Sequence, residues 1–178
     1  MNPNNEISHQ LQDLVSWSVS ILGDSIKNEF GEKTYEQVEL LRKKMKTLRS
    51  KDHQKVYEDL SGELKKLEKI SSKKLHEICL SFSLMLELIN RCETAYRASK
   101  LEHREVILPK KKPHAIIFVL TAHPTEARSP EILGLFENIQ ELLLKALKLD
   151  KERFSKELNH LLLIALKVSI SRNTSPVS

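Results

Sequence analysis

The sequence predicts a mostly α-helical fold that carries one β-strand, and three observations support this. Apolar residues recur at helical spacing along most of the 178 residues. Aromatic residues make up only 5% of the chain and there are 4 glycines, whereas Leu, Lys, Glu and Ser are abundant. The exception is the run 115–120, which is short, apolar and rich in β-branched residues, as a buried parallel strand is.

Composition narrows the class of protein. A chain of 178 residues can bury one core, so one domain is expected. The net charge of +5 is mild, and no basic stripe is interleaved with aromatic residues, which argues against nucleic-acid binding. Residues 1–10 are polar and unlike a signal peptide, and no apolar run reaches membrane-spanning length. We therefore expect a cytoplasmic protein.

The first three predicted helices cover 8–30, 34–49 and 53–70. The first has one apolar stripe, with Trp17 and Ile21 on a second covered face, and Gly31 is expected to end it. Residues 34–37 resemble a capping box that starts the second helix. The predicted buried positions of the three helices are Leu11, Leu14, Val15, Val19, Leu22, Ile26, Phe30, Val38, Leu41, Met45, Leu48, Val56, Leu60, Leu64 and Leu67.

A fourth helix is predicted over 73–100, after a cap at Ser71 or Ser72, with apolar residues around much of its axis. Its two cysteines, Cys79 and Cys92, lie on different faces and are expected to be buried, reduced thiols; neither belongs to a zinc-binding pattern. Asn90, Glu93 and Arg97 share one face of this helix. That polar row either points inward and holds a neighbouring loop or forms ordinary surface.

A basic stretch begins within the second predicted helix and continues beyond its end. It can be interpreted as an anion-binding patch or as the solvated back of a surface helix, and interspersed acidic residues favour the second interpretation. The basic residues are Arg42, Lys43, Lys44, Lys46, Arg49, Lys51 and Lys55.

The candidate site follows the predicted strand, in the turn 121–128. His123 can exchange a proton near neutral pH, and Arg128 offers a planar set of donors for a carboxylate or phosphate. Ser129 and Pro130 suit the N-cap and first position of the next helix, whose positive end would point back at the turn. From these residues alone, His123 fits either a catalytic group or a hydrogen-bonded structural histidine.

Two more helices are predicted, over 130–149 and 154–170, followed by a polar tail. The sequence thus divides into a helical region, 1–114, that ends in a basic connector, and a second part, 115–178, within one continuous partial domain. A single strand has no partner for its backbone N–H and C=O groups. We therefore expect the strand to belong to a larger sheet or barrel that needs additional chain.

Several motifs together resemble the phosphoenolpyruvate carboxylase family. Residues 119–126 read VLTAHPTE, as the signature of that family does. Residues 22–27, Gly31-Glu32, Val38-Glu39 and Arg42 are similar to its LGxxIK…GE…VExxR helices, and residues 82–93 to its FSxFLxLxNxAE helix. The motifs occur in family order along nearly the whole chain, but they cover only the amino-terminal portion of that longer enzyme.

The resemblance implies a fold, a reaction and residue roles. The fold is a parallel β/α barrel wrapped in extra helices, of which 115–120 would be the first strand. The reaction is carboxylation of phosphoenolpyruvate by bicarbonate, giving oxaloacetate and phosphate, in a homo-oligomer that needs Mg²⁺ or Mn²⁺. His123 takes the position of the catalytic base and Arg128 that of a substrate contact, although the family has two arginines one residue later. The metal ligands belong to later chain, so this chain is expected to be inactive alone.

Two other classes of function remain open. The chain could be a non-catalytic helical module that serves binding or assembly, because its leucine-rich helices would seek a partner. Alternatively, the His123 and Arg128 turn could serve a different enzyme that acts on another phosphorylated or carboxylic substrate.

Overall fold

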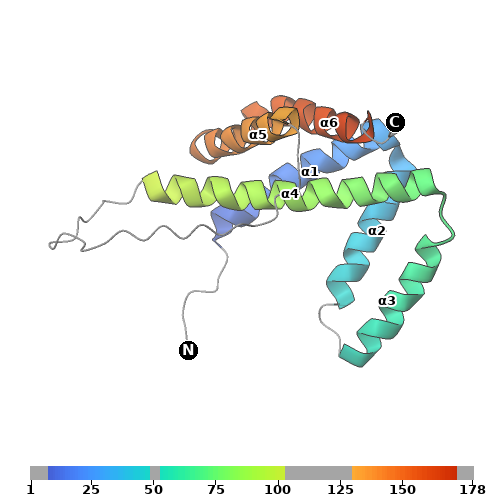
Figure 1. Ribbon diagram of the computed structural model, residues 1–178. Helices are drawn as coiled ribbons and strands as arrows, with labels where there is room; N and C mark the ends of the chain where they lie inside the picture. Colours follow the sequence, from blue (N-terminus) through green and yellow to red (C-terminus); the bar gives the residue numbers. More distant parts are fainter. Residues whose placement is uncertain (1–7, 49–52, 103–129, 172–178) are drawn as a thin grey trace, which may run out of the picture.

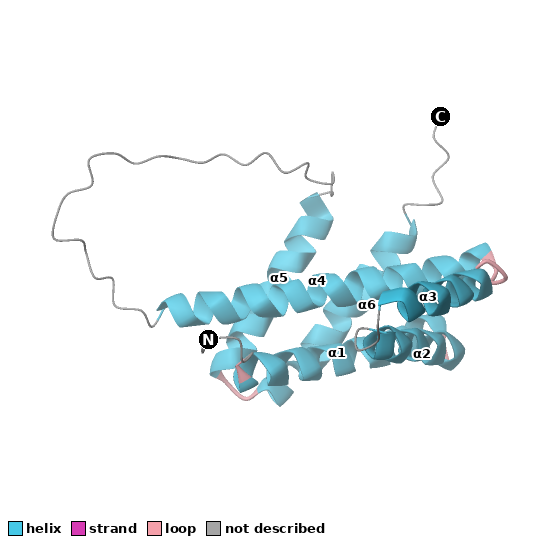
Figure 2. Ribbon diagram, turned by 90° about the horizontal axis from the view of Figure 1, so that it is seen from below, coloured by secondary structure: helices cyan, strands magenta, loops and turns pink. Residues whose placement is uncertain are grey.

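The computed structural model describes residues 8–48, 53–102 and 130–171, which form six α-helices and one short 3-10 helix (Figure 1). These residues contain no strand (Figure 2), and the predicted strand 115–120 lies outside them. The mostly helical prediction is therefore confirmed for this part of the chain. The elements are α1 (His9–Phe30), α2 (Glu32–Leu48), α3 (His53–Leu67), α4 (Ser72–Glu102), α5 (Pro130–Lys148), the 3-10 helix η1 (Lys151–Phe154) and α6 (Ser155–Ser171).

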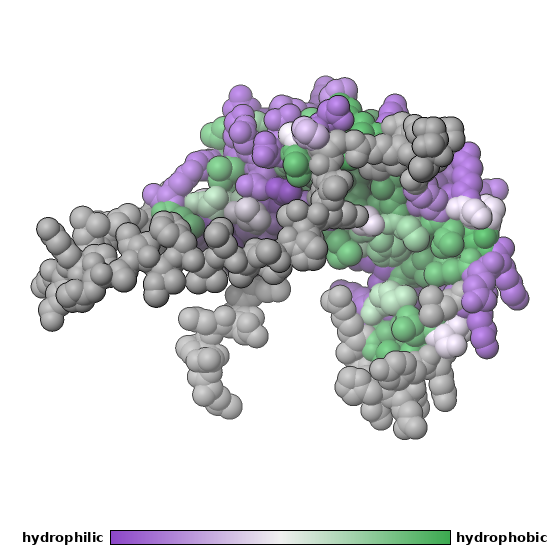
Figure 3. Space-filling view, viewed as in Figure 1, coloured by the Kyte–Doolittle hydropathy of each residue, from purple (hydrophilic) through white to green (hydrophobic). Residues whose placement is uncertain are grey.

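The long helix α4 is the axis on which four other helices pack. It contacts α1, α2, α5 and α6, while α1 also packs against α6. The helices α2 and α3 extend away from this bundle as a pair (Figure 1). Polar side chains cover much of the outward side of α5 and α6 (Figure 3), as amphipathic helices with one buried face require.

One hydrophobic core joins α1, α4, α5 and α6. Its most enclosed members come from all four helices and include Leu22, Leu88, Leu143 and Leu162. A second, smaller cluster of Val38, Leu41 and Ile78 packs the middle of α2 against α4. Since the main core draws on residues 14 to 166, the two ends of the described chain are folded together.

The predicted stripe of α1 is largely confirmed. Leu14, Leu22 and Ile26 are buried, and Trp17 is buried on the second face as expected. The indole Nε1 of Trp17 donates to Ser155 Oγ at 3.2 Å, which satisfies the one polar atom of this ring. Trp17 is also the single tryptophan of the chain, so its emission reports on the contact between α1 and α6.

The capping box predicted at 34–37 is wrong, because α2 already begins at Glu32. Gly31 has φ +84°, a conformation that favours glycine, and its carbonyl oxygen accepts from Thr34 and Tyr35 N–H. Thr34 is instead buried within α2. Its hydroxyl lies 2.9 Å from the Phe30 carbonyl oxygen and 3.1 Å from Glu77 Oε2, its two possible acceptors. The sharp corner at Gly31 leaves no room for a separate cap.

Other helix ends agree more closely with the pattern. Ser71 Oγ accepts from the Lys74 N–H at 3.4 Å and so caps α4, as predicted. Helix α3 ends at Leu67 rather than at residue 70, and Val56, Leu60 and Leu67 are only partly buried. Asp150 Oδ1 accepts from the Glu152 N–H at 3.2 Å, which starts the 3-10 turn ahead of α6.

The two cysteines have different environments. Cys92 is buried in the main core, as predicted, with its Sγ 3.2 Å from Ser18 Oγ. Burial raises the pKa of the Cys92 thiol to about 11, although the hydrogen bond with Ser18 lowers it slightly. Cys79 is exposed, so its predicted burial is wrong. The error arises because α4 is not surrounded on all sides by the described helices.

We expect the Cys92 thiol to make the stability of the fold depend on pH in the alkaline range. The folded thiol has a pKa of about 11 against the ordinary 9.0, so the folded chain binds more protons between these values. Stability therefore falls as pH rises through this window, by at most about 2–3 kcal/mol. Urea unfolding from pH 8 to 10.5 measures the fall. Cys92→Ala should lose this component of the slope, whereas parallel curves for the two proteins would contradict it.

Candidate functional site

The predicted catalytic turn lies outside the described residues. This holds for His123 and Arg128, for the strand 115–120 and for Ser129. The structure does describe the two anchors of that segment, namely the end of α4 at Glu102 and the start of α5 at Pro130. The helices α4 and α5, which flank the segment that contains this turn, are therefore the described part of the candidate site.

Helix α5 begins at Pro130, the position that the sequence predicts. A helix start presents unpaired N–H groups and a partial positive charge, which suit an anion. The first turn also carries Glu131, an exposed carboxylate that the sequence interpretation did not use. Its negative charge stabilises the helix start but would oppose an incoming anion, so an anion at this position would need cationic side chains as well as the helix end.

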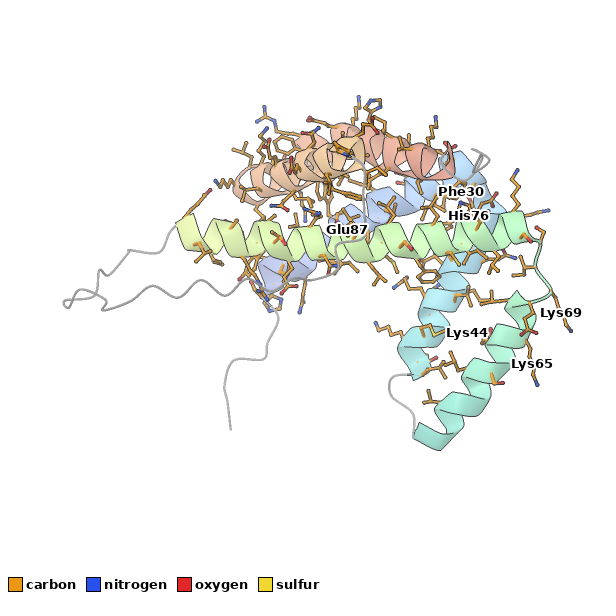
Figure 4. The ribbon with its side chains drawn as sticks, in the orientation of Figure 1. Phe30, Lys44, Lys65, Lys69, His76 and Glu87 are labelled. Carbon is orange, nitrogen blue, oxygen red and sulfur yellow. The ribbon has the colours of Figure 1, made fainter. Side chains whose placement is uncertain are left out.

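Arg91 fixes α5 onto α4. Its Nε donates to Glu87 Oε1 at 2.9 Å, and one terminal nitrogen, Nη1, donates to Gln140 Oε1 at 3.0 Å. The guanidinium carbon lies 5.6 Å from the centre of the Phe136 ring. Arg91 and Glu87 are largely buried, with side-chain exposures of 24% and 15%, and Figure 4 labels Glu87 midway along α4. Because water is largely excluded, this contact sets the position of α5 more firmly than a surface pair would.

The same contact positions the start of α5, because Phe136 and Gln140 lie six and ten residues after Pro130 on one rigid helix. A loop that enters a helix held in this way has one fixed end. The ion pair of Glu87 and Arg91 could be expected from the sequence, because the two residues have the favourable i,i+4 spacing. The contact with Gln140 across the helices had no such signal.

The motif residues of α1 make contacts that shape its junction with α2. Gly23 faces the Tyr35 ring so closely that an added Cβ would lie 3.0 Å from Cε2 of the ring. The Lys27 ammonium lies 4.2 Å from the centre of that ring and 3.4 Å from Glu32 Oε1. Ser25, which lies between these motif residues at a variable position, is buried, and its Oγ donates to Asn159 Oδ1 of α6 at 2.7 Å. These residues thus have structural roles.

Glu39 and Arg42 form a bidentate ion pair on α2. Arg42 Nε and Nη2 donate to the two carboxylate oxygens of Glu39 at 2.8 and 2.7 Å. This hydrogen bonding holds the pKa of Glu39 below its ordinary value despite partial burial, and it raises the pKa of Arg42. The pair therefore stabilises the fold at neutral pH and loses this contribution as the pH falls below the ordinary carboxylate value.

Lys44, another member of the basic stretch, also has an acidic partner. Lys44 Nζ lies 2.6 Å from Glu63 Oε1, which joins α2 to α3, and Lys66 lies 2.8 Å from the same oxygen. Figure 4 shows Lys44 on α2, Lys65 on α3 and Lys69 in the turn that follows α3. Arg49 and Lys51 fall outside the described residues. The described contacts support the interpretation of a solvated helical surface.

The polar row of α4 points outward. Asn90, Glu93 and Arg97 are all exposed, and Arg97 Nη2 lies 2.5 Å from Glu93 Oε1. The inward alternative, in which the row is packed within the bundle, is therefore wrong for the described helices. The physical reason is that α4 turns its Leu84, Leu88 and Cys92 face toward the core.

Other candidate sites in the described chain are weak. An open pocket of about 650 Å³ lies beside the end of α4, but its Lys148 lies 2.5 Å from Glu102 and so is already paired. No group of three metal-ligating side chains occurs within residues 8–48, 53–102 and 130–171. In those same ranges, each helix is too short or too polar to cross a membrane.

Comparison with known proteins gives one positive result. Residues 11–116 match the family model described as phosphoenolpyruvate carboxylase, and this range contains α1 to α4 in full apart from the first two residues of α1. The match ends before the TAHPTE sequence at 121–126. No curated protein and no solved structure matches the chain. More than half of the sequence is thus covered by one family model, and the chain belongs to the phosphoenolpyruvate carboxylase family, as part of its amino-terminal portion.

Proposed function

We propose that this chain contributes to a phosphoenolpyruvate carboxylase, which converts phosphoenolpyruvate and bicarbonate to oxaloacetate and phosphate. The observation that carries the proposal is the family match over residues 11–116, followed directly by the VLTAHPTE sequence at 119–126. Such a reaction fixes carbon and replenishes the tricarboxylic acid cycle in the cytoplasm, and the complete enzyme would be a homo-oligomer.

In this proposal His123 is the catalytic base. Transfer of the phosphoryl group to bicarbonate gives carboxyphosphate and the enolate of pyruvate. The imidazole of His123 takes the proton of carboxyphosphate, which then releases CO₂ and phosphate, and the enolate carbon attacks the CO₂. An imidazole suits this step because its ordinary pKa lies near neutral pH. Arg128 would contact the anionic substrate through its guanidinium group.

The divalent cation of the family, Mg²⁺ or Mn²⁺, does not fit the described residues, which bring no three metal-ligating side chains together. We therefore propose that its ligands lie in chain outside the described residues. Because these ligands would come from other chain, we also propose that the 178-residue chain does not catalyse the reaction by itself. It would supply the outer helices, the first strand of the barrel and His123, while the remaining pocket comes from other chain.

A reconstitution assay tests this function. The chain is purified alone and also co-expressed with a carboxylase portion that lacks the corresponding amino-terminal part. Oxaloacetate is measured by coupling it to NADH oxidation through malate dehydrogenase. We expect no turnover from the chain alone and turnover from the pair. Turnover by the isolated chain would refute its proposed inactivity.

A pair that associates stably without turnover would favour the alternative function, a non-catalytic assembly module derived from the family. This alternative is supported by two exposed leucines, Leu40 on α2 and Leu86 on α4, which could contact a partner protein.

A further inference from the structure

One face of α4 is covered by none of the described helices. Exposed residues follow each other on it at spacings of three and four, the spacing of a single helical stripe. We call this stripe the open face of α4, and it consists of Cys79, Ser83, Leu86, Asn90, Glu93 and Arg97. In its middle, Leu86 is 59% exposed. Four turns further along the helix, Leu101 is 62% exposed.

Motif residues concentrate on this open face. Ser83, Leu86, Asn90 and Glu93 belong to the stretch that resembles the FSxFLxLxNxAE helix. Motif residues elsewhere in the described chain have evident structural partners, as Lys27 has in Glu32 and Glu39 in Arg42. Leu86, by contrast, projects from the bundle as a large apolar side chain. A single exposed leucine is ordinary on a protein surface. An apolar side chain bordered by polar ones is nevertheless compatible with the apolar centre and polar rim of a protein contact.

The chain itself carries an apolar segment that can reach this face. Residues 115–120 (AIIFVL) follow a connector of twelve residues, 103–114, that leaves the end of α4. Leu86 lies about 24 Å back along α4 from Glu102, at about 1.5 Å per residue. A connector of that length spans up to about 40 Å when extended, so Leu86 is within its reach.

The other end of the segment is tethered close to the same helix. The start of α5 precedes Phe136 by six residues, about 9 Å of helix, and Phe136 lies against Arg91 in the middle of α4. The nine residues 121–129 between the apolar segment and Pro130 span up to about 30 Å. Two short tethers to one helix give the segment an effective concentration on the order of millimolar at that helix.

We propose that the open face of α4 is the docking surface for the apolar segment 115–120 of the same chain. Leu86 and one side of the segment would bury each other. The polar side chains of Asn90, Glu93 and Arg97 would lie at the edge of this contact. A second copy of the chain could offer the same apolar residues, but at micromolar concentration it competes poorly with a tethered segment. The proposal concerns folding of the chain and does not depend on carboxylase activity.

Disulfide trapping in the full 178-residue chain tests the proposal. In a Cys79→Ser background, Leu86→Cys is combined with Ile116→Cys or with Ile117→Cys, because neighbouring residues of an extended segment point to opposite sides. Leu40→Cys on α2 is the matched control, since Leu40 is also a leucine on a helix surface and is 55% exposed. Cys92 can stay, because it is buried. Each variant is oxidised mildly over a dilution series and mapped by mass spectrometry.

We expect one of the two Leu86→Cys pairs to form a disulfide within one chain, at least tenfold faster than the Leu40→Cys pairs and at a rate independent of protein concentration. Equal rates for the Leu86→Cys and Leu40→Cys pairs would overturn the proposal. Disulfides that form mainly between chains, faster at higher concentration, would overturn it in favour of a second copy as the occupant.

A second measurement keeps the test decisive if a double variant fails to fold. The single variants Leu86→Cys and Leu40→Cys, each with Cys79→Ser, are labelled with a maleimide. The docked segment should slow labelling at position 86 severalfold relative to position 40, and adding Ile116→Asp and Ile117→Asp should remove the difference. Equal labelling without those two aspartates would contradict docking.

Discussion

Asparagine in place of His123 is expected to lower the turnover of the reconstituted carboxylase by about 10²–10⁴-fold, the range that a positioned acid–base group contributes. The amide keeps the approximate size and polarity of the imidazole but cannot accept the proton of carboxyphosphate. Since the proton transfer and not substrate contact is removed, kcat should fall more than the KM for phosphoenolpyruvate rises. The coupled assay measures both constants.

His160→Asn is the matched control for this substitution. His160 lies exposed on α6, so its replacement should leave turnover within about twofold and stability within about 0.5 kcal/mol. Equal turnover for the His123→Asn and unaltered enzymes would remove His123 from the mechanism. If instead His123→Asn prevented association of the two portions, its role would be structural.

Alanine in place of Leu143 is expected to lower the free energy of unfolding by about 3–5 kcal/mol. Leu143 is fully buried on α5, within the core that α5 shares with α1, α4 and α6. The change removes buried methyl groups and leaves a cavity that four helices cannot all close at once. Urea unfolding, followed by the emission of Trp17, measures the effect.

Leu149→Ala provides the comparison. Leu149 follows the end of α5 and is 58% exposed, so the same change of side chain should cost less than about 0.5 kcal/mol. Similar costs at the two positions would mean that α5 is not packed into a shared core. The arrangement of the helices would then be wrong.

The helices could be predicted from the sequence because their buried faces repeat at the helical period. Leu14, Leu22 and Ile26 show this on α1, and the proline at position 130 marks the start of α5. The α1–α2 corner was missed for a local reason. A threonine followed by polar residues is typical of a cap, but the positive φ of Gly31 lets the second helix start before Thr34. The exposure of Cys79 was missed because the apolar residues around α4 do not reveal which side lacks a neighbour.

For the candidate site, the sequence indicates chemistry better than geometry. The TAHPTE motif predicts a role for His123, and that role stays a prediction because the turn lies outside the described residues. Contacts between distant segments have no periodic signal. Three contacts depend on how two helices meet, namely those of Gly23 with Tyr35, Ser25 with Asn159 and Arg91 with Gln140. The motif residues of α1 could be recognised from sequence, but their partners could not.

The helices α1, α4, α5 and α6 share one core, and we therefore expect them to unfold as one cooperative unit. The most direct test is urea unfolding of the 178-residue chain, with far-UV circular dichroism and Trp17 emission recorded on the same samples. We expect one coincident transition, from a helical chain with blue-shifted emission to an unfolded chain with red-shifted emission. Gradual loss of helix, or Trp17 emission typical of water before any unfolding, would contradict it.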